Sequence, residues 1–297
     1  MYRGRETGGF ISWACFDEYI QTMAGYVCTI AGGKGGVGKT TTAINIGAVL
    51  EENDYDTVIV DADLGMANLG EMLGAEHEET IHDVLAGNST VSAALTDAPG
   101  GLTIIPGEQS LEAFAEADPA KLRKVIKTLK NTFDVVLVDT GAGLSHETTV
   151  PLGLADGILL VTTPDHVAVN DTIKTAELAQ RVDGRILGTL VARVTRDTDV
   201  PSIADDFDVP ILGVVPLDLE ATEREPHVLN YPESYSSEAY RQLTTQLERV
   251  FFEGVPGSEL DHVFDEEWFV EEDDEDDEAE EDAEKEESDG VFGGLFR

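Results

Sequence analysis

The chain has 297 residues, enough to bury the core of one large α/β domain. Its 60 Asp and Glu against 19 Lys and Arg give a formal net charge of −41, and such a surface repels DNA and anionic lipid at low salt. This acidity favours the hypothesis of a protein adapted to a salt-rich cytoplasm. The two cysteines, Cys15 and Cys28, exclude a disulfide framework or a four-cysteine metal site.

The first 22 residues show no clear period and precede a second methionine, Met23. We interpret residues 1–22 as a disordered extension or a mis-called start. No apolar run approaches the roughly 20 residues that span a bilayer, and no signal-peptide pattern is evident. The expected location is therefore the cytoplasm.

From Tyr26 onward, short apolar runs alternate with helical patterns. The runs predict strands, and they read YVCTI, TVIVDAD, LTIIPG, FDVVLVDTG, GILLVTTP, RILGTLVARV and PILGVVP. The helical patterns are TTTAINIGAVLEEN, DPAKLRKVIKTLKN, HVAVNDTIKTAELAQRV and SSEAYRQLTTQLERVF. Alternation of this kind predicts an α/β fold with a doubly wound, mainly parallel sheet, whose ligands bind at the carboxyl ends of the strands.

The ordered domain is expected to cover residues 23–257 and to be followed by an acidic disordered tail, 258–297. Between Glu271 and Asp289, 15 of 19 positions are Asp or Glu, a composition typical of a self-repelling disordered segment. The chain then ends in an apolar tip, GVFGGLFR. Phe292, Leu295 and Phe296 could anchor this tip to a membrane or a partner, and the alternative is a frayed tail.

A phosphate-binding loop is predicted between the first strand and the first helix. Residues Gly33 to Thr40 fit G-x-x-x-x-G-K-[ST] in the required strand–loop–helix context. Backbone N–H groups of the loop and the helix N-terminus would hold the phosphates, Lys39 would reach the β- and γ-phosphates, and Thr40 would coordinate Mg²⁺. The predicted nucleotide-binding residues are Gly33, Lys34, Gly35, Gly36, Val37, Gly38, Lys39, Thr40 and Thr41.

Three aspartates are expected at neighbouring strand ends. Asp139 follows four apolar residues and has the pattern of a metal-holding Walker-B aspartate. Asp61 and Asp63 lie two apart and therefore face the same way along a strand. One can tether the magnesium shell while the other orients the attacking water. The predicted metal-binding set is thus Thr40, Asp61 and Asp139.

The runs GGKGGVGKTTT, VDADLGMANLGEMLG and VDTGAGL resemble the MinD/ParA family of deviant Walker-A ATPases, closest to MinD-like proteins of the haloarchaeal type. The resemblance covers roughly residues 26–252 and implies a P-loop NTPase fold of the SIMIBI type with ATP and Mg²⁺ as cofactors. It also implies slow, partner-stimulated ATP hydrolysis and an ATP-dependent homodimer that positions other cellular machinery. By position, Lys34 matches the signature lysine that reaches the partner's phosphates, and Asp63 matches the residue that positions water, so Lys34, Lys39 and Asp63 are the candidate catalytic residues.

Two departures from the family pattern are visible. Ala192 precedes Arg193 where many relatives carry an asparagine, so adenine specificity is only implied by the family. Gly141 stands where proline or alanine is common, which is expected to alter the loop after Asp139.

Several functions remain open from the sequence. A ParA-like partition ATPase that binds non-specific DNA needs a basic surface, and basic residues cluster only in KLRKVIKTLK. A nucleotide-clamped scaffold without significant hydrolysis is a further alternative, against which Asp63 argues. An iron–sulfur carrier lacks the required cysteines. The favoured hypothesis is a MinD-like switch that binds a protein activator or cargo adaptor. The membrane or a cell pole is a further expected location, and DNA is not an expected partner.

Overall fold

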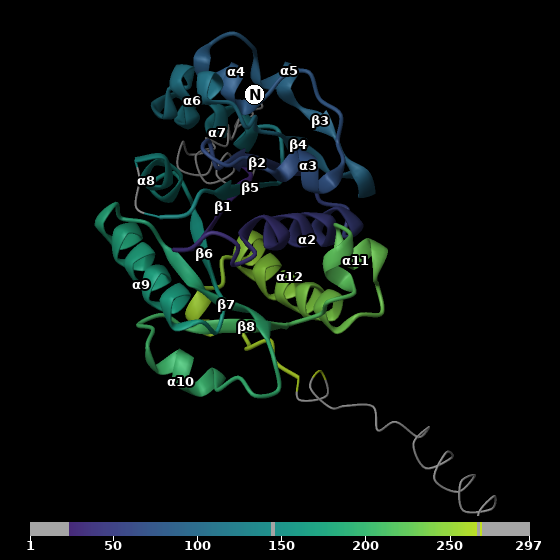
Figure 1. The fold of residues 1–297 in the computed structure, drawn as a ribbon, viewed down its shortest axis with the longest axis vertical. Coiled ribbons are helices and arrows are strands. Elements are labelled where there is room, and N and C mark those ends of the chain that lie inside the picture. Colours follow the sequence, from purple (N-terminus) through teal and green to yellow (C-terminus); the bar gives the residue numbers. More distant parts are fainter. Residues whose placement is uncertain (1–23, 144–145, 266–267, 269–297) are drawn as a thin grey trace, which may run out of the picture. The chain divides into compact units, whose positions relative to one another are not determined.

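The described residues form one eight-stranded sheet in the computed structural model (Figure 1). Its strand order is β3-β4-β2-β5-β1-β6-β7-β8, and only the β3–β4 pair is antiparallel. The predicted doubly wound, mainly parallel sheet is therefore confirmed. The strand bounds are β1 (Tyr26–Ala31), β2 (Thr57–Ala62), β3 (Thr96–Asp97), β4 (Thr103–Ile105), β5 (Val135–Thr140), β6 (Gly157–Thr162), β7 (Ile186–Val194) and β8 (Ile211–Pro216).

All seven predicted strands are present, because their apolar runs are buried on both faces of the sheet. Strands β2, β5, β6 and β8 are buried at every position. The two-residue edge strand β3 was not predicted, since it is polar and too short to show a period.

Helices cover both faces of the sheet (Figure 1). Along β2, Ile59 lies against Gly47 of α2, whereas Val58 and Val60 share a core cluster with α4 and α7, so these helices occupy opposite faces. The helix bounds are α2 (Lys39–Glu52), α3 (Leu69–Leu73), α4 (Ile81–Ala86), α5 (Val91–Ala94), α6 (Leu111–Glu116), α7 (Leu122–Lys130), α8 (His146–Leu152), α9 (His166–Arg181), α10 (Val200–Asp205), α11 (His227–Asn230) and α12 (Tyr235–Glu253).

The structure describes residues 24–143, 146–265 and 268. One unit of the chain ends at Phe264, and Asp265 begins the second. Val263 pairs with the outer edge of β8, since its N–H donates to Leu212 O and its carbonyl accepts from Val214 N. Among the described helices, none is both long and apolar enough to cross a bilayer. The expected extension at 1–22 and the apolar tip at 291–297 lie outside the described residues.

Candidate functional site

The predicted phosphate loop lies between β1 and α2, and three glycines allow its course. Gly36 and Gly38 adopt left-handed backbone angles, with φ of 78° and 99°, which favour glycine. A Cβ atom on Gly33 would lie 2.0 Å from the carbonyl carbon of Asp171, so no side chain fits there. The N–H of Gly33 donates to Thr172 Oγ1 at 3.3 Å. The loop is thus held against α9 on one side and continues directly into α2.

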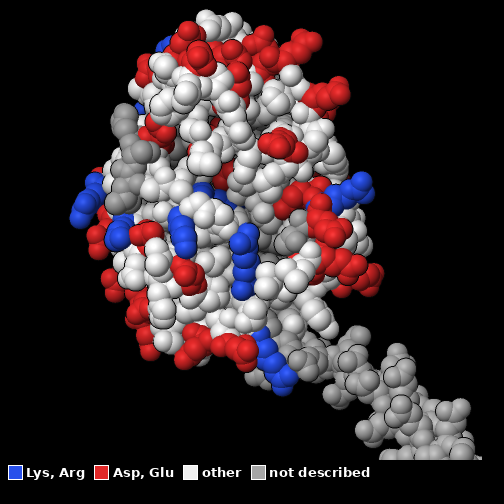
Figure 2. Space-filling view, in the orientation of Figure 1, with Lys and Arg blue, Asp and Glu red and all other residues white. Residues whose placement is uncertain are grey.

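The two lysines of the loop have different environments. Lys39 is the first residue of α2 and is only 7% exposed. Lys34 has a side chain that is 45% exposed, and its Nζ lies 3.0 Å from Asp165 Oδ1 at the start of α9. Lys and Arg side chains gather near the middle of the face seen in Figure 2, whereas acidic side chains dominate its margins. One lysine therefore belongs to the interior of the loop and the other to the molecular surface.

A hydroxyl and a buried carboxylate meet at the start of α2. Thr40 Oγ1 lies 2.6 Å from Asp139 Oδ2 and 3.2 Å from Asn68 Oδ1, and the shorter contact takes its proton. Asp139 is 1% exposed, and its Oδ1 has no hydrogen-bond partner among the described residues. Burial, together with the neighbouring Asp61, raises the pKa of Asp139 to about 8, although Thr40 and Lys39 oppose the rise.

Asp61 faces Asp139 across neighbouring parallel strands, since the two residues are register partners on β2 and β5. Its Oδ1 accepts the N–H of Asp63 at 3.2 Å, and its Oδ2 accepts the N–H groups of Asn68 at 3.0 Å and Leu69 at 3.1 Å. Burial and then the charge of Asp63 raise its pKa to about 6, against these three backbone donors. Asp61 therefore organises the loop that follows β2.

Asp63 lies on that loop beside the end of β5. Its Oδ1 accepts the N–H of Met66 at 3.0 Å. A Cβ atom on Gly141 would come within 3.0 Å of the same oxygen. The glycine that departs from the family pattern therefore leaves the space that the Asp63 carboxylate occupies.

The structure brings together the sequence-predicted set of Lys39, Thr40, Asp61 and Asp139 and places Asp63 at its edge. Asp139 Oδ1 is an orphaned buried oxygen next to a hydroxyl, which suits a hard cation such as Mg²⁺. The described residues hold no cluster of three or more His, Cys, Asp or Glu arranged for a metal ion. A cation here would thus take its remaining ligands from phosphate and water, as Mg²⁺ commonly does.

A pocket of about 400 Å³ opens beside Gly38 and Thr41. Its walls come from the ends of β7 and β8 and from the segment that leads into α12. No residue of these three segments was among the predicted site residues. The position of Pro216-Leu217-Asp218 at the carboxyl end of a predicted strand was a usable signal, because Asp139 was predicted from the same kind of position. The lining residues used below are Thr41, Arg193, Asp218, Glu225, His227 and Tyr240.

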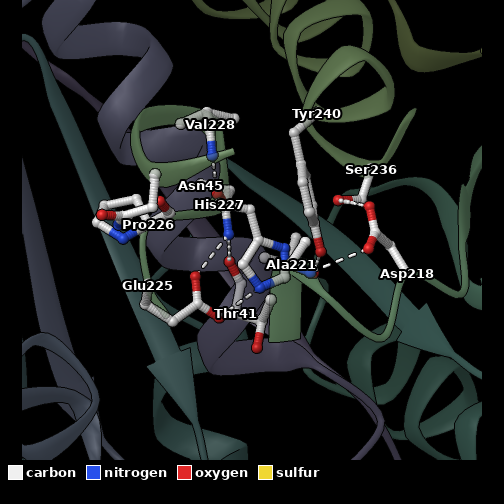
Figure 3. Close-up of polar contacts among 12 residues, drawn as sticks. Thr41, Asn45, Asp218, Ala221, Glu225, Pro226, His227, Val228, Ser236 and Tyr240 are labelled. Atoms are coloured by element: carbon white, nitrogen blue, oxygen red, sulfur yellow. Dashed lines mark hydrogen bonds and ion pairs between the residues drawn. The ribbon is translucent and has the colours of Figure 1, made fainter. Parts of the chain in front are cut away.

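A buried amide joins α2 to this pocket (Figure 3). Asn45 Nδ2 donates to Thr41 O and to Glu225 Oε2, both at 2.9 Å, and Asn45 Oδ1 accepts the N–H of Val228 at 3.0 Å. Glu225 Oε1 lies 3.3 Å from Nε2 of His227. The pocket wall and the helix that carries Thr40 are therefore fixed to each other by side-chain contacts.

A phosphate loop between a parallel strand and a helix, with aspartates at the ends of two neighbouring strands, defines a P-loop nucleotide-binding protein. The AAA domain family matches residues 25–187 of the chain. An uncharacterized ATP-binding protein of Methanocaldococcus jannaschii is 33% identical over 234 residues, covering 76% of this chain and 89% of the relative. The septum site-determining protein MinD of Synechocystis is 30% identical over 237 residues, covering 75% and 89%.

Among solved structures, the septum site-determining protein MinD of Pyrococcus horikoshii, complexed with Mg-ADP, is 34% identical with a TM-score of 0.71. That match covers 76% of this chain and 96% of the other. The chain belongs to the MinD/ParA family of P-loop ATPases, as the motifs predicted.

Proposed function

We propose that the protein is an ATP-dependent dimerising switch, in which hydrolysis of ATP resets the dimer. The observation that carries this proposal is the contrast between the two loop lysines. Lys39 is buried in its own loop, whereas Lys34 projects at the surface with 45% of its side chain exposed. A surface cation beside a phosphate site is available to a nucleotide bound by a second copy. Since the γ-phosphate adds negative charge, a lysine supplied by the second copy would stabilise the dimer more with ATP bound than with ADP bound.

The residues of one copy then divide the work of phosphoryl transfer to water. The loop N–H groups and Lys39 hold the phosphates, and Thr40 and Asp139 would hold Mg²⁺. Bound Mg²⁺ neutralises the charge that develops on the phosphate oxygens. Asp61 holds the loop after β2 through three backbone contacts, and through that loop it positions Asp63, which orients the attacking water. The pocket bounded by Arg193, Asp218 and His227 takes the base.

The biological output of the switch is the positioning of other machinery. The name of the Synechocystis relative, a septum site-determining protein, supports this class of role. Division proteins, chemosensory arrays and surface filaments are all compatible cargoes. A protein activator or cargo adaptor would set the hydrolysis rate and the cellular location.

Sedimentation velocity with ATP, ADP or a non-hydrolysable ATP analogue tests the proposal. Wild-type protein is expected to dimerise with ATP and the analogue and to remain monomeric with ADP. Lys34→Ala should keep nucleotide binding but lose the dimer, Lys39→Ala should lose binding, and Asp63→Ala should retain the dimer after ATP addition because it cannot hydrolyse. Dimerisation of Lys34→Ala at the wild-type concentration would contradict the role of Lys34 in trans.

A further inference from the structure

An exposed apolar groove lies beside the loop that carries Asp63. It has a volume of about 540 Å³ and is separate from the pocket beside Thr41. Three of its side chains are large, apolar and open to solvent: Met66 at 75%, Leu111 at 83% and Phe114 at 39% exposure. We call it the α6 groove, and its lining residues are Gly65, Met66, Asn68, Gln109, Ser110, Leu111 and Phe114.

The chain segments around the α6 groove are rich in acidic residues. The two segments that line it, residues 65–68 and 109–114, contain no lysine or arginine. The longer stretches that include them, residues 63–79 and 102–118, also lack both and carry nine Asp and Glu residues. Within α6 itself, Glu112 and Glu116 are exposed beside Leu111 and Phe114. Acidic side chains also predominate in the part of Figure 2 where Figure 1 places α4 and α6. The groove therefore combines an apolar floor with a negative rim.

Two side chains connect the α6 groove to the Asp63 loop. Gln109 Nε2 donates to Ala67 O at 2.7 Å. The N–H of Glu108 donates to Nδ1 of buried His82 at 3.1 Å, so the ring proton sits on Nε2 and is donated to Leu64 O at 2.9 Å. A displacement of the groove wall would thus be transmitted to the loop that holds Asp63.

We infer that the α6 groove binds a basic amphipathic helix of a partner protein. Helices bind such grooves through apolar residues spaced three and four apart, and lysine or arginine on the flanking positions would complement the acidic rim. Anionic lipid is repelled by the same carboxylates. A second copy of this chain is also a poor occupant, because α7, the most basic of the described helices, buries its apolar face in its own core.

Site-specific photocrosslinking in the native host tests which occupant is bound. A benzoylphenylalanine replaces Phe114 in the groove, and a matched variant carries it at Phe252, which has a similar exposure of 42% and lies on α12. The crosslinked peptide is then sequenced by mass spectrometry. We expect the Phe114 position alone to capture a segment of another protein with net positive charge and apolar residues at helical spacing. Capture of lipid, of a second copy or of an acidic segment would overturn the inference, as would equal capture from Phe252 or no capture at all.

A synthetic copy of the captured segment provides the quantitative test. Its affinity, measured by fluorescence anisotropy, should fall at least tenfold in Leu111→Ser/Phe114→Ser, and separately in Glu112→Lys/Glu116→Lys, which keeps the apolar floor. Unchanged affinity in either variant would overturn the inference. A second readout rests on the proposed function: the segment should change the ATPase rate of wild-type protein but not of Gln109→Ala. Binding without any ATPase activity would contradict the proposed function and leave the groove assignment standing.

Discussion

Lys34 and Asp165 form an ion pair across the mouth of the phosphate loop, with Nζ 3.0 Å from Oδ1. The same Asp165 oxygen accepts the N–H of Ala168 and so caps the N-terminus of α9. This pairing, first with Lys34 and then with the helix N–H, lowers the pKa of Asp165. In a single copy, the lysine proposed to act in trans is therefore held by a carboxylate of its own chain.

Removing the charge of Asp165 should strengthen ATP-dependent dimerisation. Lys34 must leave Asp165 before it can reach a phosphate of the second copy, so the ion pair competes with the dimer. In Asp165→Asn the asparagine still caps α9, because Asn is a good N-cap residue. We expect the dimer dissociation constant with ATP to fall by about two- to fivefold, the size that a weak exposed ion pair allows. Analytical ultracentrifugation at several protein concentrations measures it.

The matched control is Asp171→Asn on the same helix. The Asp171 carboxylate pairs with Lys174 at 2.8 Å and is partly exposed, and the lysine that it holds is Lys174 and not Lys34. Its backbone packs against Gly33, so the control also keeps the contact between α9 and the phosphate loop. This variant should dimerise as the wild type does. An equal gain in both variants would attribute the effect to net charge and not to release of Lys34.

The strands and the phosphate loop could be predicted from the sequence because each depends on local pattern. A strand covered on both faces needs a continuous apolar run, and β5 shows one that ends directly at Asp139. The nine-residue amphipathic helix α7 is also evident from its spacing of buried residues. These features follow from chain-local periodicity and need no knowledge of tertiary contacts.

The rest of the site depends on contacts between distant segments. Lys34 and Asp165 are 131 positions apart, and Asn45 and Glu225 are 180 apart, so no local pattern links them. The short helices, including α6 and α11, span too few residues to show a period. The space left by Gly141 for Asp63 likewise appears only when the ends of β2 and β5 are brought together.

Adding one methyl group at Gly141 should slow hydrolysis without abolishing nucleotide binding. A Cβ there would lie 3.0 Å from Asp63 Oδ1, and the half-exposed carboxylate would have to shift. We expect kcat of Gly141→Ala to fall by about tenfold or more, because small displacements of a positioning group are costly. Nucleotide affinity, measured by fluorescence titration, should stay within about twofold of the wild type, since a twofold change is a small binding free energy. Gly153→Ala, where the added carbon meets ordinary contacts of 3.7 Å or more, should retain wild-type turnover.

Neutralising Asp139 should stabilise the nucleotide-free protein at high pH. Its folded-state pKa is raised to about 8, above the ordinary value, so the folded form holds a proton that the unfolded form releases. The protein therefore loses no stability from Asp139 below the ordinary pKa of a carboxyl group. It loses stability progressively as the pH rises above that value, and the loss is complete once the pH has passed the folded-state pKa. At pH 8.5 the free energy of unfolding of Asp139→Asn should exceed that of the wild type by at least about 2 kcal/mol, since each unit of pKa difference corresponds to about 1.4 kcal/mol.

Urea unfolding between pH 5 and 9, without nucleotide or Mg²⁺, gives the comparison. The difference between Asp139→Asn and the wild type should be smallest at pH 5, grow as the pH rises and level off above the folded-state pKa of about 8. A difference that does not vary with pH would show that the raised pKa has no bearing on stability. The same variant should lose the Mg²⁺-dependent part of its nucleotide affinity.

Asn45→Ala should destabilise the fold and weaken nucleotide binding together. The substitution removes the amide that joins Thr41, Glu225 and Val228, leaving a buried carboxylate oxygen and a backbone N–H without this partner. Unsatisfied buried groups cost about 1–3 kcal/mol each, so we expect unfolding free energy to fall by about 2–4 kcal/mol. Because Glu225 and His227 line the pocket, nucleotide affinity should fall about tenfold, or 1.4 kcal/mol.

Asn53→Ala is the matched control, at the residue that follows the C-terminal end of α2. Asn53 donates to Glu248 at 2.7 Å but is exposed, so water replaces the lost contact. Its unfolding free energy should change by less than about 1 kcal/mol and its nucleotide affinity should not change. If Asn45→Ala lost stability but bound nucleotide as tightly as Asn53→Ala, the prediction would be contradicted. The Asn45 amide would then stabilise the fold alone, and the pocket wall at Glu225 and His227 would not contact the bound nucleotide.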